Sequence, residues 1–365
     1  MDQERSNLRR GWTTGACATA AAKAAYAALL GGAFPDPIEI PLPGGARAAF
    51  ALAETSLRDG IAACAIVKDA GDDPDVTHGA LIRVSLRRLE PGAGILFRAG
   101  PGVGTVTRPG LPIPPGEPAI NPVPRQMIAA ALAEIAPDHA VEVTIGVDDG
   151  EALATKTLNG RLGIVGGLSI LGTTGIVIPY SCAAWIDTIH RGIDVARAMG
   201  LDHIAGSTGS TSEAAVQALH HLPETALIEM GDFAGGMLKY LRTHPIPRLT
   251  IAGGVAKMTK LAQGRLDLHS KRGEADLQAL AHCAATCGGD EALQTRIAAS
   301  NTVAEAFNHA AAAGIGLGDA VAQAAWRTAA DVLAPAPIAL EIVLFDRTGA
   351  LAGRAHAVPP RNRRT

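Results

Sequence analysis

Three consecutive segments decide the fold class of this chain: DHIAGSTGSTSEAAVQALHHL at 202–222, TALIEMGDFAGGMLKYLRTH at 225–244 and LTIAGGVAKMTKLAQG at 249–264. Each begins with a short apolar run typical of a buried strand and continues with the apolar spacing of a helix. Strands that alternate with helices along a chain predict a parallel sheet. We therefore expect the second half to be an α/β domain of the Rossmann-like type.

The sequence on either side of these segments separates this domain from a different first half. Helical spacing covers 181–199 and much of 274–333, and IALEIVLF at 338–345 is predicted to be the final strand. In the first half, an Ala-rich helix is expected at 16–30, with Thr13 or Thr14 as its cap and Gly31-Gly32 as its end. Further elements are expected as strands at 38–41, 48–54, 61–67, 81–89, 95–98 and 141–147, a helix at 126–135, and a proline-rich loop at 100–125.

These patterns predict two domains in the 365 residues. Residues 1–183 are expected to form a mixed α+β domain with Gly- and Pro-rich loops. Residues 184–358 are expected to form a smaller parallel-sheet α/β domain, and 359–365 (PPRNRRT) a disordered tail.

Composition excludes several classes of function. Apolar residues make up 48% and charged residues 18% of the chain, which excludes global disorder. A net charge of −3 and an aromatic content of 3% argue against nucleic acid as a partner. A charged N-terminus, no long apolar run and five scattered cysteines predict a cytoplasmic protein with no membrane partner and no disulfide framework.

Glycines follow each predicted strand of the second half. In a parallel sheet the carboxyl ends of the strands share one edge, and ligands bind there in open α/β folds. A helix start at this edge offers free backbone N–H groups to an anion, and Ser210 and Glu213 have the spacing of a capping box. The alternative is that these are ordinary turn glycines. The cofactor-binding candidates are Gly206, Ser207, Thr208, Gly209, Asp232, Gly253 and Gly254.

Two lysines follow the third strand. Lys257 and Lys260 lie three residues apart on one helix, so both can face an anion. The alternative is that both are simply solvated.

The start of the first half offers a second candidate region. Gly15 permits close approach of a ligand to the helix start, and Lys23 lies within the same helix. Cys17 in the first turn could have a depressed pKa, although a small buried residue is the simpler interpretation.

An acidic segment, KDAGDDPDVTHG at 68–79, places Asp69, Asp72, Asp73 and Asp75 near His78. It lacks EF-hand spacing, and it could bind a metal or a cationic group or be a polar surface loop.

Two other patterns are weak. Gly100, Gly102 and Gly104 lack the following helix of a nucleotide-binding motif, and the set His282, Cys283 and Cys287 makes a poor zinc site. No resident metal is predicted. The residues alone indicate an α/β enzyme that binds a small anionic or nucleoside-bearing ligand.

Long segments of the chain resemble the CbiD family, the cobalt-precorrin-5B C(1)-methyltransferases of anaerobic cobalamin biosynthesis. The resemblance rests on LRRGWTTGACATAAAKAA at 8–25, KDAGDDPDVTHG at 68–79, PGVGTVTRPGL at 101–111, GEPAINPVPRQMI at 116–128, LNGRLGIVGGLSILGTTGIVIPYS at 158–181, GSTGSTSE at 206–213, GDFAGGMLKY at 231–240 and IAGGVAKMTKLAQGRLDLHS at 251–270. Beyond residue 280 the likeness is one of composition only.

The resemblance implies methylation of ring carbon 1 of cobalt-precorrin-5B to give cobalt-precorrin-6A, with S-adenosylmethionine (SAM) as the methyl donor. Cobalt then enters only as part of the tetrapyrrole substrate. The cofactor candidates above would hold SAM. Asp72, Asp73 and His78 are candidate catalytic residues, with His78 as a base or an axial cobalt ligand. The substrate-binding candidates are Thr13, Thr14, Gly15, Lys23, Lys156, Arg161, Lys257 and Lys260, and Lys68 and Arg265 are further possible cations.

Two other functions remain open at this stage. A nucleotide-dependent kinase or oxidoreductase would use the same glycine edge, but the chain has neither a P-loop nor a GxGxxG motif. A non-catalytic carrier of corrinoid intermediates would bind pigment without SAM. A homo-oligomer is compatible with the sequence.

Overall fold

The computed structural model describes residues 8–137 and 139–356, so the predicted disordered tail at 359–365 lies outside the described residues. Internal contacts divide the chain into two units, Met1–Cys182 and Ala183–Thr365. The two units are nearly equal in length, whereas the sequence led us to expect a smaller second domain. Each unit is described by itself below.

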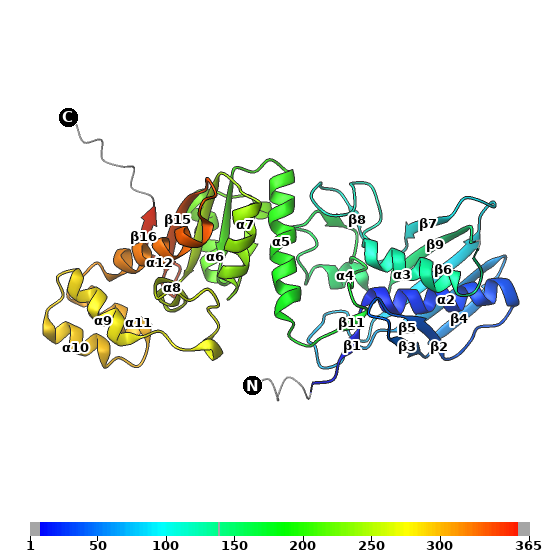
Figure 1. Cartoon of the computed structure of the whole chain (residues 1–365), viewed down its shortest axis with the longest axis horizontal. Coiled ribbons are helices and arrows are strands. Elements are labelled where there is room, and N and C mark those ends of the chain that lie inside the picture. The colour runs from blue at the N-terminus through cyan, green and yellow to red at the C-terminus, as the bar shows by residue number, and fades with distance from the viewer. Residues whose placement is uncertain (1–7, 138, 357–365) are drawn as a thin grey trace. The chain divides into compact units, whose positions relative to one another are not determined.

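The first unit is built on a five-stranded sheet with the order β4-β5-β6-β9-β7 (Figure 1). Neighbouring strands are antiparallel except β7, which runs parallel to β9. In β6, every second residue up to Leu86 is buried, which is the pattern of a sheet with one face on a core. The strands span Glu54–Arg58 (β4), Ile61–Val67 (β5), Leu81–Arg88 (β6), Ile95–Ala99 (β7) and Val141–Val147 (β9).

Helix α2 (Thr14–Gly31) packs on β5, β6 and helix α3 (Pro122–Ala133). All of its alanines except Ala27 are buried, and such small side chains let neighbouring backbones approach closely. The Thr13 hydroxyl caps the helix by accepting a hydrogen bond from the amide of Ala16, and Gly32 ends it with a φ of 79°. The predicted caps are confirmed at both ends.

Short strand pairs complete the first unit. The strand expected at 48–54 is in fact two strands, β3 and β4, because the chain leaves the hairpin with β2 and joins the sheet beside β5. The remaining elements are β1 (Gly11–Trp12), β2 (Ile38–Pro41), β3 (Arg47–Phe50), β8 (Thr105–Val106), α4 (Gly150–Ala154), β10 (Ile164–Val165) and β11 (Ile176–Val177).

The second unit contains a five-stranded sheet with the order β13-β12-β14-β15-β16. The first four strands are parallel, as predicted, and β16 is antiparallel to β15. The prediction that 338–345 is the last strand is wrong, because pairing with β15 draws the short segment Leu351–His356 (LAGRAH) into the sheet. The strands span His203–Ser207 (β12), Leu227–Glu229 (β13), Arg248–Gly254 (β14), Ala339–Phe345 (β15) and Leu351–His356 (β16).

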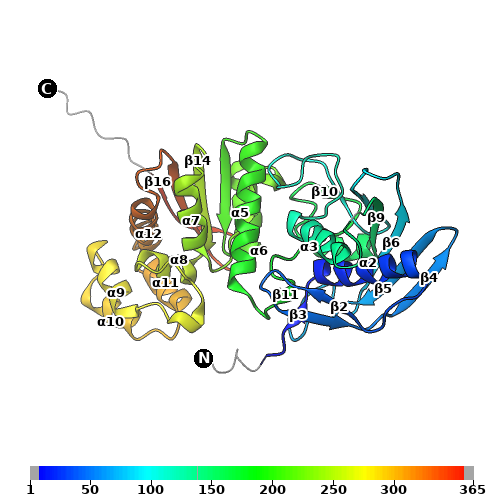
Figure 2. The same cartoon turned by 45° about the vertical axis from the view of Figure 1, so that its right-hand side comes forward.

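Helices flank this sheet. The right-handed crossover that parallel strands prefer puts α6 (Ser210–His220) on one face of this strand order and α7 (Ala234–Thr243) and α8 (Val255–Ala262) on the other. Helix α12 (Leu317–Leu333) contacts both α7 and α8 (Figure 2). The others are α5 (Cys182–Ala198), α9 (Leu277–Thr286), α10 (Glu291–Ala298) and α11 (Val303–Ala312). Within the described ranges, no helix combines the length and the apolar character needed to span a bilayer.

Candidate functional site

The carboxyl edge of the second sheet brings most of the cofactor candidates together. Strand β12 lies between β13 and β14, and its last residue, Ser207, is in register with Glu229 on one side and Ala252 on the other. The connection through α6 joins β12 to β13 on one side of β12. The connections that follow lead to β14 and β15 on the other side of β12. The strand order therefore reverses at β12 and β14, and open α/β sheets bind ligands at such a switch point.

The glycines at this edge have two different roles. A Cβ on Gly206 would lie 2.4 Å from the sulfur of Met237, and one on Gly253 would lie 2.6 Å from the sulfur of Met258. A side chain at either position would therefore force a buried methionine below the edge to move. A Cβ on Gly209 or Gly254 would meet no atom within 4 Å, so these two backbones border open space.

Two helices begin at these open glycines. Gly209 is the N-cap of α6 and Gly254 is the N-cap of α8, and neither helix has a side-chain cap. The predicted capping box is wrong, because Ser210 is already helical and Glu213 instead accepts a hydrogen bond from the Ser207 hydroxyl at 3.3 Å. First-turn amides at a helix start favour negatively charged or polar ligand atoms.

Asp232 and Lys257 form a polar pair at the same edge. The Lys257 ammonium donates a hydrogen bond to the Thr208 carbonyl at 2.8 Å and lies 3.1 Å from Oδ1 of Asp232. That Oδ1 atom is buried and has no well-oriented hydrogen bond, so the contact is an ion pair only. The Asp232 side chain is 22% exposed, which leaves Oδ2 as the oxygen that a ligand can reach.

Several predicted contacts at this edge are instead structural. Ser207 and Thr208 are buried at 0% and 6% exposure. Lys260 is buried, and its ammonium donates to the Leu268 carbonyl at 3.1 Å. The Lys260 ammonium is therefore not placed to bind substrate, because it lies inside the protein against the Leu268 carbonyl.

At the start of α2, the predicted substrate hydroxyls have protein partners. Thr13 is the helix cap, and the Thr14 hydroxyl both donates to and accepts from the Leu171 backbone at 3.1 Å. A Cβ on Gly15 would lie 2.8 Å from the ring of Pro124. These three residues fasten the segment after Ile170 to the helix and are not open to a ligand.

The predicted cations of the first unit differ in exposure. Lys23 is buried, pairs with Glu134 at 2.5 Å and donates to the Glu39 carbonyl, so it does not fit the substrate-binding role. Lys156 is exposed and has no side-chain partner among the described residues, and Arg161 is half-buried. Of the substrate candidates in this unit, Lys156 best fits a contact with a carboxylate.

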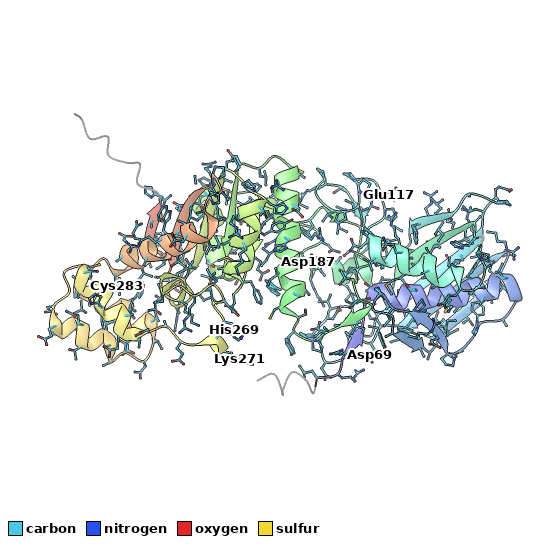
Figure 3. All side chains as sticks on the ribbon, viewed as in Figure 1. Asp69, Glu117, Asp187, His269, Lys271 and Cys283 are labelled. Carbon is cyan, nitrogen blue, oxygen red and sulfur yellow. The ribbon has the colours of Figure 1, made fainter. Side chains whose placement is uncertain are left out.

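The acidic loop at 68–79 is held by its own carboxylates (Figure 3 labels Asp69). Asp69 pairs with Arg9, Asp72 accepts the Arg9 amide at 2.6 Å, and Asp73 accepts the Tyr180 amide at 2.8 Å. The hydrogen bond from Arg9 lowers the pKa of Asp69 to about 2. Within the described ranges, no group of three acidic, His or Cys residues is arranged to hold a metal.

His78 lies at the end of this loop with its side chain 52% exposed. Its Nδ1 accepts a hydrogen bond from the Ala70 amide at 3.1 Å, so in the neutral ring the proton lies on Nε2. This arrangement fits a hydrogen-bond donor, because neither nitrogen keeps a free lone pair for the predicted role of base or cobalt ligand.

Three weaker motifs have structural explanations. Burial raises the pKa of the Cys17 thiol to about 12, which overturns the idea of a reactive thiolate. A Cβ on Gly102 would lie 2.0 Å from the Val147 carbonyl, so that glycine permits close packing. Burial also raises the pKa of Cys283, which lines a cavity of about 510 Å³ with Thr259, Asp276 and Val321 of the second unit.

The sequence did not reveal that three of its motifs meet in the first unit. Strand β1 pairs with β11, and the Trp12 amide donates to the Asp69 carbonyl at 2.7 Å. The acidic loop, the start of α2 and the segment before Cys182 therefore form one assembly. Tyr180 was missed as a candidate because its partner, Asp73, lies 107 positions away.

Known proteins resemble this chain over its full length. A family model described as CbiD matches residues 1–179, and one described as CbiD, C-terminal domain, matches residues 267–356. A protein from Agrobacterium fabrum named cobalt-precorrin-5B C(1)-methyltransferase is 62% identical, with 100% of both chains covered. Proteins of the same name from Halorhodospira halophila and Bradyrhizobium sp. are 61% and 60% identical, over 95% and 98% of this chain and 94% and 97% of theirs.

A crystal structure of a cobalamin biosynthesis protein (CbiD) from Archaeoglobus fulgidus is similar with a TM-score of 0.40 and 28% identity, over 73% of this chain and 83% of that one. The matches to the C-terminal family model and to the curated relatives overturn one expectation. The family likeness does not fade into mere composition beyond residue 280.

Proposed function

Since the chain belongs to the CbiD family and its function is the methylation of cobalt-precorrin-5B at carbon 1 in cobalamin biosynthesis, we propose that SAM is the methyl donor and binds at the carboxyl edge of the second unit. The observation that carries this proposal is the switch point between β12 and β14, where Gly209 and Gly254 border open space. A nucleoside can approach both backbones there, because no Cβ stands in the way.

The residues at this edge suit the parts of SAM. Oδ2 of Asp232 can accept hydrogen bonds from ribose hydroxyls or from the amino group, and Lys257 holds this carboxylate in place. The uncapped starts of α6 and α8 offer amides to the carboxylate of the methionine part. The donor supplies an activated methyl group on a sulfonium, so no protein nucleophile is required.

For the reaction itself, the chain's main task is to position two molecules. Methyl transfer is an in-line displacement in which the macrocycle carbon is the nucleophile. Holding the reactants in line can contribute up to about 7–11 kcal/mol. We assign substrate carboxylates to the exposed Lys156 and to the half-buried Arg161. We assign Asp72 and Asp73 a positioning role, because backbone amides occupy their carboxylates.

The activity is tested by anaerobic incubation of the protein with cobalt-precorrin-5B and SAM, followed by mass spectrometry of the pigment. We expect a gain of one methylene mass that depends on SAM. Bound but unchanged pigment would favour a corrinoid carrier, and a dependence on ATP or NAD(P) would favour the nucleotide-dependent alternative. We place the reaction in the cytoplasm, where cells make and use SAM.

The donor site is tested by calorimetric titration of SAM into Asp232→Ala. Loss of a charged hydrogen-bond acceptor is expected to weaken SAM binding by roughly ten- to a hundredfold. Asp202→Ala is a matched control, because Asp202 pairs with Arg248 at the opposite, amino edge of the same sheet. Equal affinity of Asp232→Ala and wild type for SAM would remove Asp232 from the site.

A further inference from the structure

Tyr180 has an unusual backbone conformation. Four non-glycine residues have a positive φ within the described ranges: Asp59, Asp149, Tyr180 and His221. Asp and His tolerate the left-handed region comparatively well, whereas a bulky residue there is a genuine outlier. Tyr180, with a φ of 55°, is the bulkiest member of the set and the one that is neither Asp nor His. Such outliers persist where the surrounding structure enforces them, and they concentrate at ligand sites.

The acidic loop enforces this conformation. The Tyr180 amide donates a hydrogen bond to Oδ1 of Asp73 at 2.8 Å. The neighbouring Asp72 is anchored in turn, because its amide donates to the Arg9 carbonyl at 2.9 Å and its carboxylate accepts the Arg9 amide at 2.6 Å. The carboxylates of this loop therefore fix the position of an aromatic residue that is remote in sequence.

The ring of Tyr180 has no polar or aromatic partner among the described residues. It is 57% exposed, and it makes no hydrogen bond or ring contact with any described residue. Ile178 and Leu171 of the same Gly-rich segment are also exposed, at 54% and 50%. An aromatic ring and two aliphatic side chains are suited to the flat, apolar face of a macrocycle.

A cation lies close to Ile178 along the backbone of the neighbouring strand. Val177 pairs with Gly11 at the end of β11, so Ile178 and Arg10 lie at the same end of that short ladder. Arg10 is exposed and has no side-chain partner among the described residues. An unpaired guanidinium can form a bidentate pair with a carboxylate, and the side chains around a precorrin ring carry carboxylates.

From these observations we infer that Tyr180 stacks on the face of the tetrapyrrole and, with Arg10 at the rim, selects the substrate in the first unit. Asp73 acts through Tyr180 as a positioning residue. This inference rests on the proposed function, because it takes the tetrapyrrole as the substrate.

The test replaces Tyr180 in the full chain and measures binding of cobalt-precorrin-5B from its absorbance change, together with the SAM affinity and the Tm. Tyr180→Phe keeps the ring and is expected to bind pigment within about twofold of wild type. Tyr180→Gly relieves the backbone outlier, so we expect an unchanged or higher Tm but roughly tenfold weaker pigment binding. Asp149→Gly is the matched control, since it relieves a φ of 55° elsewhere in the first unit.

The role of Asp73 is tested in a double-mutant cycle. Asp73→Ala alone should raise the KM for pigment, and in the Tyr180→Gly background it should add nothing. A further fall in kcat in that background would mean that Asp73 acts on the reaction directly and would overturn its positioning role.

Wild-type affinity of Tyr180→Gly for the pigment would overturn the stacking itself, as would equal losses in Tyr180→Phe and Tyr180→Gly. Methylation by the wild type is measured in parallel. If it fails while the pigment titration separates the variants as expected, the proposed function is wrong but the binding role of Tyr180 stands.

Discussion

At the scale of single residues, lysines show why charge in a sequence does not reveal a ligand site. Lys23, Lys68 and Lys260 all fit the pattern of anion binders, yet each is less than a tenth exposed and has a protein acceptor. Lys68, at 1% exposure, pairs with Asp75 at 2.6 Å within the acidic loop. A buried charge requires such a partner, and only the fold determines whether a distant carboxylate supplies it.

His203 makes the stability of the second unit dependent on pH. Burial, followed by the neighbouring His220, lowers the pKa of His203, whose Nε2 lies 2.9 Å from the Thr250 hydroxyl. Because the unfolded chain binds this proton more readily, stability falls as the pH drops below about 6.5. We expect the urea midpoint of the wild type to fall between pH 7.5 and 5.5, and that of His203→Gln to fall less. Parallel curves for the two proteins would contradict this.

At the scale of elements, the sequence predicted those whose signals are local. The caps of α2 and the span of β5 agree with expectation, because a capping hydroxyl and an apolar run act within a few residues. Helix α3 begins at Pro122, four residues before the predicted start at 126, because proline is well suited to the first helical position and so belongs to the helix and not to the loop. Strand β16 was missed because its pairing with β15 creates it.

The contact between α12 and β16 gives a prediction at this scale. A Cβ on Gly318 would lie 1.7 Å from the Ala352 carbonyl oxygen, so the helix and the strand could not keep their present distance. Gly318→Ala is expected to destabilise the second unit by roughly 2–3 kcal/mol, measured by urea unfolding. Gly316→Ala, where a Cβ meets nothing within 4 Å, should change stability little. Equal stability of the two variants would refute the close contact.

At the scale of the whole molecule, the described residues form two large, separate hydrophobic cores besides a small cluster around Ile113. One surrounds α2 and includes Ile145, and the other surrounds the parallel sheet and includes Ile251; both side chains are 0% exposed. Each core lies within one of the two units. Domains with their own cores are expected to unfold as separate cooperative units.

Calorimetry tests this independence. We expect two unfolding transitions, with Ile145→Ala lowering one midpoint and Ile251→Ala the other. Each substitution should cost about 2–5 kcal/mol, because it leaves a cavity in a fully packed core. A single transition that both variants shift equally would show that the two cores unfold together.

The sequence alone determined the α/β class of the second unit, the mixed character of the first, the glycine edge and the family, since repeated strand–helix periodicity and long motifs are properties of the linear chain. The tertiary structure decided which polar groups are available. It buried Lys260, gave the carboxylates of the acidic loop protein partners and left the Tyr180 ring exposed, held through Asp73. The reason is physical: the environment of a side chain depends on neighbours that are distant in sequence, and folding alone brings them together.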